Sequence, residues 1–213
     1  MQRPNWFVAL VVPEQAGLSR FLVDLPASVR AFDAADLHLT VAFLGPCDQE
    51  QALLAWEAIA PLCHPALSVV TAGWRVMGPA QNPSAYALSL GPDPGQQQAG
   101  QSSRVATELI ESWRRPALAA AGLPPERRAA LPHITLARPR RRGIEADRAA
   151  MATWLLQALP PQRELLLRDI ALYTWDDDRQ QRLFKIQAQR PLAGQVSGAG
   201  DGQARAEAPG ALA

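Results

Sequence analysis

The sequence predicts an α+β fold in which strands and helices build two similar lobes. Strand-like and helix-like segments alternate through both halves of the chain, and each half contains one copy of a shared pattern, LHLTVAF from Leu37 and PHITLAR from Pro132. The 213 residues, of which 48% are hydrophobic, suffice for one domain with an ordinary core. We therefore expect residues 1–192 to form a single bilobal domain, followed by a disordered tail at residues 193–213.

In the first half of the chain, apolar spacing and turn residues define the expected elements. Bulky and β-branched residues up to Pro13 indicate a buried strand, and the next apolar residues recur at helical spacing. Gly45 and Pro46 stop a second strand, after which Asp48 is suited to cap a helix. We expect strands at residues 6–12, 37–44, 67–77 and 85–90, and helices at residues 14–25 and 48–62.

The second half repeats this alternation and ends in a hairpin. We expect helices at residues 102–121 and 145–159, and strands at residues 131–137, 164–175 and 182–189. The turn of the hairpin contains Asp176, Asp177 and Asp178. Because consecutive side chains diverge, we expect a solvated turn here and not a cation site.

Charge and composition exclude several classes of protein. The 21 basic and 20 acidic residues give a net charge of +1, so any contact with nucleic acid should be local. The apolar run at the start of the chain stops at Pro13, which is too early for a membrane span, and it lacks a small-residue cleavage site. The two cysteines, Cys47 and Cys63, lack the spacing of a metal site or disulfide framework. We expect a cytoplasmic protein with reduced thiols and no membrane association.

The two copies of the shared pattern each carry a histidine followed two residues later by a threonine, His38 with Thr40 and His133 with Thr135. Side chains alternate between the faces of a strand, so each histidine should lie on the same face as its threonine. The aliphatic residues between and after them should point into the core: Leu39, Val41, Ile134 and Leu136. The third histidine, His64, has no such partner and is expected at the surface.

Two imidazoles and two hydroxyls in one cleft suit the hydrolysis of a cyclic phosphodiester. One imidazole can take a proton from water while the other protonates the departing ribose oxygen, because histidine titrates near neutral pH. The hydroxyls can donate hydrogen bonds to the non-bridging phosphate oxygens, where negative charge must be held. The sequence therefore predicts a phosphodiesterase site formed by His38, Thr40, His133 and Thr135.

These residues resemble those of a known family. The opening strand WFVALVV and the blocks LHLTVAFLG and PHITLARPR resemble the two-histidine phosphoesterase superfamily, specifically its bacterial RNA 2',3'-cyclic phosphodiesterase branch, once described as 2'-5' RNA ligases. The resemblance covers residues 6–192. It implies two pseudo-symmetric lobes of antiparallel sheet, helices packed outside, motifs that face a central cleft, and no metal or other cofactor.

The resemblance also implies a reaction, in which RNA ends or nucleotides that bear a 2',3'-cyclic phosphate are hydrolysed to 2'-phosphates. We expect a monomer in which His133 is the base and His38 the acid, and the similarity of the two motifs leaves the exchanged roles open. The resemblance further implies substrate contacts from Phe43 and Arg138, each five residues after a motif histidine. Strict alternation puts both on the opposite face from the histidines, so a bulge or the strand end must reorient them.

Three alternatives remain open from the residues. A zinc hydrolase would need three ligands, for which only Asp33 and Asp36 stand near His38. A non-catalytic module that binds RNA ends would use the basic clusters around Arg114, Arg127 and residues 138–142. Within the enzyme class, the substrate could be a small cyclic nucleotide or an ADP-ribose cyclic phosphate.

Overall fold

The computed structural model describes residues 3–62, 64–79, 81–91, 103–140 and 145–192. Its strands are β1 (Asn5–Val11), β2 (Val29–Ala31), β3 (His38–Pro46), β4 (Leu67–Met77), β5 (Ala85–Leu90), β6 (His133–Pro139), β7 (Glu164–Leu167), β8 (Asp169–Trp175) and β9 (Phe184–Pro191). Its helices are α1 (Gln49–Ala58), α2 (Arg104–Ala120) and α3 (Glu145–Gln157), with 3-10 turns η1 (Glu14–Ala16), η2 (Leu18–Phe21) and η3 (Ala34–Asp36).

All strands belong to one antiparallel sheet in the order β7-β4-β5-β6-β3-β1-β8-β9, and β2 pairs with β6. The two central strands, β3 and β6, pair in register at a single position, Leu39 opposite Ile134. Each motif strand is instead paired extensively with its outer neighbour, β1 for β3 and β5 for β6. The predicted α+β architecture is confirmed, and its two lobes are the halves of one sheet.

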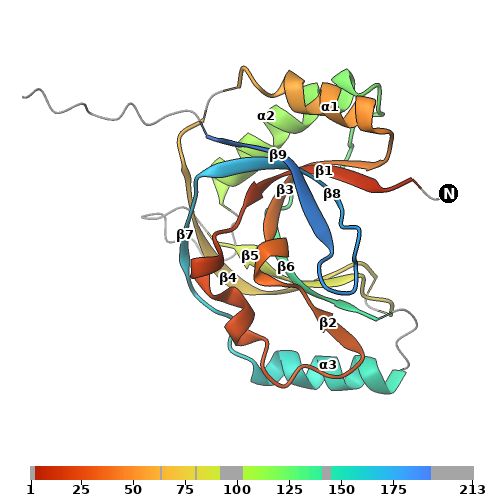
Figure 1. Ribbon diagram of the computed structural model, residues 1–213. Helices are drawn as coiled ribbons and strands as arrows, with labels where there is room; N and C mark the ends of the chain where they lie inside the picture. Colours follow the sequence, from red (N-terminus) through yellow and green to blue (C-terminus); the bar gives the residue numbers. More distant parts are fainter. Residues whose placement is uncertain (1–2, 63, 80, 92–102, 141–144, 193–213) are drawn as a thin grey trace, which may run out of the picture.

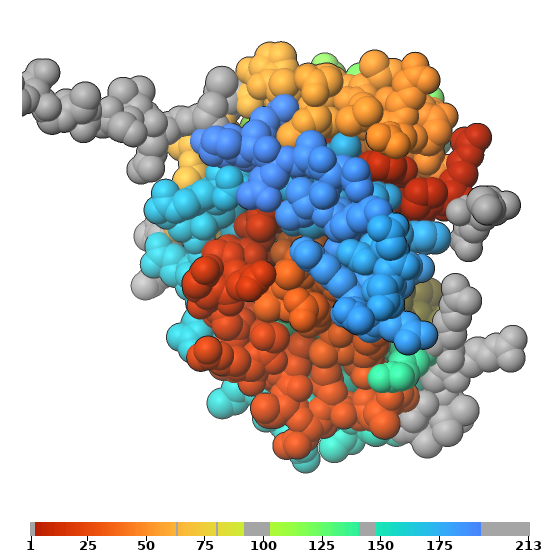
Figure 2. All heavy atoms as spheres, viewed as in Figure 1, coloured from red at the N-terminus to blue at the C-terminus, as the bar shows by residue number. Residues whose placement is uncertain are grey.

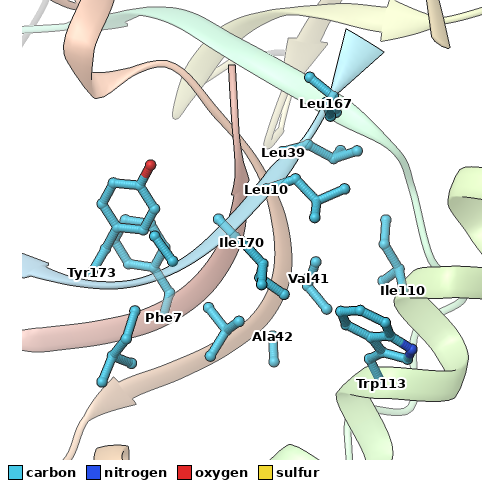
Figure 3. Packing of buried hydrophobic residues seen from close by; sticks show 14 of the residues in the cluster. Phe7, Leu10, Leu39, Val41, Ala42, Ile110, Trp113, Leu167, Ile170 and Tyr173 are labelled. Atoms are coloured by element: carbon cyan, nitrogen blue, oxygen red, sulfur yellow. The ribbon is translucent and has the colours of Figure 1, made fainter. Parts of the chain in front are cut away.

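Helices cover the two halves separately. α1 and α2 lie at one end of the molecule and α3 at the other (Figure 1). In the main core, Leu39 and Val41 of β3 lie toward Ile110 and Trp113 of α2 (Figure 3). A second, smaller cluster between α3 and the strands contains Val29, Tyr86, Ala137, Met151 and Trp154. The apolar face of each motif strand is thus buried, which fixes the orientation of the opposite face.

Two predicted elements were wrong. The expected helix at residues 14–25 is a pair of short 3-10 turns, because Gly17 between them adopts a left-handed conformation with φ of 64°. The expected strand at residues 164–175 is two strands that separate at Arg168, because β7 pairs with β4 in one half and β8 pairs with β1 in the other. The short strand β2 was not anticipated.

Some expectations concern residues outside the described ranges: the start of the expected helix at residue 102, Cys63, Arg141 and Arg142, and the tail at residues 193–213. In the part of the chain that is described, no helix has the length and apolar character needed to cross a membrane.

Candidate active site

The pairing of β3 with β6 brings both histidine-threonine motifs to one place. Extending the register by one residue on each side of Leu39 and Ile134 puts His38 opposite Thr135 and Thr40 opposite His133. Leu39 and Ile134 are buried, whereas His38, Thr40 and His133 are only partly buried and Thr135 is 9% exposed. The face predicted from strand alternation is therefore the observed one.

Both imidazoles are held in the same way by the main chain. Nδ1 of His38 lies 2.7 Å from the carbonyl oxygen of Asp36, and Nδ1 of His133 lies 2.6 Å from that of Leu131. A carbonyl oxygen only accepts, so Nδ1 must carry the hydrogen in both rings. In each neutral ring the lone pair is then on Nε2, on the side away from the supporting carbonyl. Each ring is therefore oriented to take or give a proton at Nε2.

The surroundings of the two imidazoles differ. Three aromatic rings enclose His38, with ring centroids 4.6 Å away for Phe7, 5.5 Å for Tyr173 and 5.5 Å for Phe184. Burial lowers the pKa of His38 from 6.5 to about 4, and the charges of Arg138 and His133 act in the same direction. We call Phe7, Tyr173 and Phe184 the aromatic wall.

Burial also lowers the pKa of His133, and the nearby charges of Arg75 and Arg138 lower it further. The hydrogen bond from its Nδ1 to Leu131 opposes this shift. Arg138 therefore acts on both imidazoles, whereas Arg75 acts on His133. Because both pKa values are lowered from 6.5, both rings are neutral at pH 7 in the free protein.

Asp36 ties the His38 strand to the C-terminal hairpin. Its buried carboxylate accepts hydrogen bonds from the main-chain N–H groups of Leu183 (2.9 Å) and Phe184 (3.1 Å), and Nε of Arg182 lies 3.5 Å away. Figure 2 shows residues 12–37, in red to orange, against the cyan and blue C-terminal strands. The main-chain carbonyl of Asp36 accepts the hydrogen bond from His38, so the anchored carboxylate of Asp36 also fixes the position of that carbonyl. Sequence reasoning considered Asp36 only as a metal ligand and missed this contact.

Matching bulges turn Phe43 and Arg138 toward the site. In the pairing of β1 with β3 the register skips Val41, and in the pairing of β5 with β6 it skips Leu136, in each case the third residue after the histidine. A bulge exchanges the faces of the residues that follow it. Phe43 is accordingly 59% exposed, and the guanidinium of Arg138 is near enough to both histidines to lower the pKa of each. The bulge required by the sequence argument is present in both strands.

A cavity of about 290 Å³ adjoins this face. Thr40, Phe43 and His133 form one side of it, Arg114 contributes positive charge, and Arg128 is paired with Glu126 at 2.6 Å. The remaining wall is mostly apolar: Val41, Met77, Ile110, Leu118, Ala129 and Leu131, together with Glu126. Its apolar lining with a few polar groups fits a flat heterocycle better than a second phosphate.

The acidic residues considered as metal ligands are engaged elsewhere. The carboxylate of Asp33 accepts from the N–H of Ala35, and Asp177 pairs with Lys185 at 2.7 Å. Asp176 and Asp178 accept from main-chain N–H groups within their own turn. Within the described ranges, no cluster of three or more His, Cys, Asp or Glu side chains could hold a metal ion.

Comparisons with known proteins give a shared fold. No family model matches the sequence, and no curated protein matches it. Among solved structures, a phosphoesterase is 19% identical, with a TM-score of 0.60 over 90% of this chain and 99% of the other. E. coli LigT complexed with 3'-AMP is 19% identical, with a TM-score of 0.63 over 90% of this chain and 100% of the other. TT0787 of Thermus thermophilus is 18% identical, with a TM-score of 0.63 over 90% and 99%.

LigT has also been solved with ATP, NADP+ and phosphate. At these identities the likeness concerns the fold. The chain has the fold of that phosphoesterase, of LigT and of TT0787.

Proposed function

We propose that this protein, with the fold of a phosphoesterase and of LigT, hydrolyses RNA 2',3'-cyclic phosphate ends to 2'-phosphates without a metal ion. One observation carries the proposal. Two histidine-threonine pairs face the same side of adjacent antiparallel strands, and both imidazoles are supported at Nδ1 by a main-chain carbonyl. Two oriented bases with two hydroxyl donors match the needs of in-line hydrolysis at phosphorus.

The reaction needs one neutral and one protonated imidazole. The neutral ring takes a proton from water as its oxygen bonds to phosphorus, and the protonated ring gives its proton to O3' as the P–O3' bond breaks. Thr40 and Thr135 donate hydrogen bonds to the non-bridging oxygens, and Arg138 adds positive charge near both histidines. The 2'-phosphate remains, and the enzyme has exchanged one proton between its imidazoles.

The roles of the two histidines are open to a direct test. We expect from the sequence that His133 is the base and His38 the acid. The pKa of His38, about 4, favours the reverse, because a ring with so low a pKa is poorly suited to carry the proton that the acid must supply. A substrate with an activated leaving group no longer needs the acid, so it should restore turnover only to the variant that lacks the acid. Rescue of His38→Ala assigns the acid to His38, and rescue of His133→Ala assigns it to His133.

The identity of the nucleotide is less constrained than the chemistry. The LigT complexes with ATP, 3'-AMP and NADP+ support a nucleotide ligand here. They also support the second candidate, a small cyclic nucleotide or an ADP-ribose cyclic phosphate. A monomer that acts in the cytoplasm stays a prediction of the sequence.

Phosphorus NMR of the products tests the proposal. Purified protein is incubated with an RNA that ends in a 2',3'-cyclic phosphate and with a cyclic mononucleotide, each with and without excess EDTA. We expect 2'-phosphates that form equally fast in EDTA. A 3'-phosphate would mean that the other P–O bond breaks, and loss in EDTA with recovery in zinc would favour a metal hydrolase. Binding of the RNA end without turnover would favour the non-catalytic module.

A further inference from the structure

Arg75 occupies a place in the sheet that sequence reasoning did not connect with the site. It lies on β4 opposite Ala87 of β5, which in turn lies opposite Thr135 of β6. The three residues form one row across three strands, so their side chains share the face that carries the histidines. Ala87 has only a methyl group, which leaves the space above it open to the guanidinium.

Among the described residues, no partner is found for the Arg75 guanidinium. Its Nε is buried without a hydrogen bond to any of them, and none of the ion pairs in the described ranges involves it. A buried arginine nitrogen is costly unless an acceptor meets it, and a carboxylate or phosphate satisfies its fork best. A hydrogen-bond acceptor on a bound ligand would remove the energetic cost of the unpartnered Arg75 nitrogen.

The corresponding row in the other half of the sheet has no charge. There Thr40 lies opposite Ala9, and Ala9 lies opposite Ala171. Arg75 thus breaks the near symmetry of the two motifs, because only one of the two rows carries a charged side chain. Two strand spacings, about 9.6 Å, separate its Cα from the Thr135 strand, so Arg75 approaches from outside the position between the two motifs, and its charge still acts on His133.

We propose that Arg75 binds a second phosphate of the substrate, the one on the 5' oxygen of the nucleotide whose ribose carries the cyclic phosphate. The inference rests on the proposed function, because it places the cyclic phosphate between the two motifs. Arg138, close to both histidines, binds the cyclic phosphate, and Arg75 binds the phosphate on the 5' oxygen. The preferred substrate class is therefore an RNA end or a 5'-phosphorylated nucleotide, and a nucleoside cyclic phosphate with a free 5'-hydroxyl is a poorer one.

Paired substrates test this inference. We would measure kcat/KM for adenosine 2',3'-cyclic phosphate with a 5'-phosphate and with a 5'-hydroxyl, in wild-type protein, Arg75→Ala, Arg75→Lys and the control Arg168→Ala. Arg168 is an exposed arginine between β7 and β8. A charge-assisted hydrogen bond supports a preference of about tenfold to a hundredfold for the 5'-phosphate. We expect Arg75→Ala to abolish this preference, Arg75→Lys to keep part of it, and Arg168→Ala to keep all of it.

Two outcomes would overturn the inference: a wild-type protein without the preference, or an equal loss on both substrates in Arg75→Ala. Calorimetric binding of adenosine 2',5'-bisphosphate and adenosine 2'-phosphate separates the inference from the proposed function. If the protein turns over no cyclic phosphate but binds the bisphosphate more tightly, and this tighter binding is lost in Arg75→Ala, the proposed hydrolysis is rejected and the second phosphate site is retained. Equal binding of both compounds would reject the second phosphate site.

Discussion

His38 and His133 have identical main-chain supports but different neighbours. The aromatic wall encloses His38, whereas His133 borders the cavity and the charge of Arg75. Both pKa values lie below the ordinary value of 6.5. A negative phosphate between the rings favours the protonated form, so the substrate itself helps to bring the proton that the reaction needs.

Replacement of either histidine by alanine should lower kcat/KM by about a hundredfold to ten-thousandfold, the usual contribution of a positioned acid or base. The double variant should be hardly slower than either single variant, because one missing proton-transfer partner already blocks the step. The measurement is turnover of a cyclic mononucleotide by variants whose circular dichroism matches the wild type. Alanine at His64, whose Nδ1 contacts the carbonyl of Pro65, is the matched control. Near-normal turnover by His38→Ala or His133→Ala would refute the site.

The pH dependence of kcat/KM should be bell-shaped, with its maximum below pH 6.5. The profile requires one protonated and one neutral imidazole in the free enzyme. The acid limb should follow the lower pKa, that of His38 at about 4, and the alkaline limb that of His133, which burial places below 6.5. Initial rates at low substrate concentration across pH 4 to 8 give the profile. A kcat/KM that still rises above pH 7 would contradict these directions.

For single residues, the sequence predicted positions that depend only on neighbours along the chain. The alternation of a strand sufficed to place His38 and Thr40 on one face. Asp36 and Arg75 could not be placed in this way. The partners of Asp36 are 147 and 148 residues away, and the position of Arg75 depends on the register of three strands.

Among the elements, the β4–β5 hairpin carries Arg75 and depends on the conformation of Gly78. Gly78, at its start, has φ of 85°, and a Cβ there would lie 2.9 Å from Oγ and 3.0 Å from N of Ser84. Ser84 closes the hairpin through its N–H bond to the carbonyl of Met77, at 2.8 Å. The turn therefore requires glycine for both its backbone conformation and its space.

Gly78→Ala should destabilise the protein more than Gly122→Ala. Both glycines have positive φ, 85° and 65°, but nothing lies within 4 Å of a Cβ at Gly122. Backbone strain alone should cost about 1 kcal/mol at Gly122, and the added clash should bring the cost at Gly78 to about 2–3 kcal/mol. Urea unfolding of the two variants gives the comparison. Equal losses would show that the hairpin relaxes around the added methyl group.

The elements that were predicted well are those whose ends are coded locally. The strands expected at residues 67–77 and 85–90 have the observed bounds, and Asp48 caps α1 with a reciprocal bond to Gln51. The strand expected at residues 164–175 failed because strand-favouring apolar residues stand on both sides of Arg168 while the pairing partner changes there. Local patterns carry no information on which strand a segment pairs with.

For the whole molecule, the two halves share a main core as well as the single ladder pair between β3 and β6, and the path of the chain also joins them. The chain runs from β1 to β2 in the other half, returns to β3, crosses again to β4 and β5, and comes back through α2 before β6. It crosses once more between β7 and β8. Each half is therefore assembled from segments that the other half separates in sequence.

Unfolding should be a single cooperative transition, because neither half is a continuous stretch of chain. Circular dichroism and tryptophan fluorescence should give the same midpoint in urea. A variant with Trp74→Phe and Trp154→Phe removes the tryptophan on α3 and the one that packs against it, so that its fluorescence reports mainly on the other half. Its fluorescence midpoint should still coincide with that from circular dichroism. Two separate midpoints would mean that the halves unfold independently.

The aromatic wall also has a magnetic consequence. Circulating electrons in Phe7, Tyr173 and Phe184 shift the resonances of nearby protons, and the His38 ring lies 4.6 to 5.5 Å from all three ring centroids. The ring contacts found in the described part of the chain do not include His133. The imidazole protons of His38 should therefore be displaced from ordinary histidine positions, and those of His133 should not. The ring protons of His38 and His133 should therefore have different chemical shifts, so each imidazole can be followed separately in the unmodified protein.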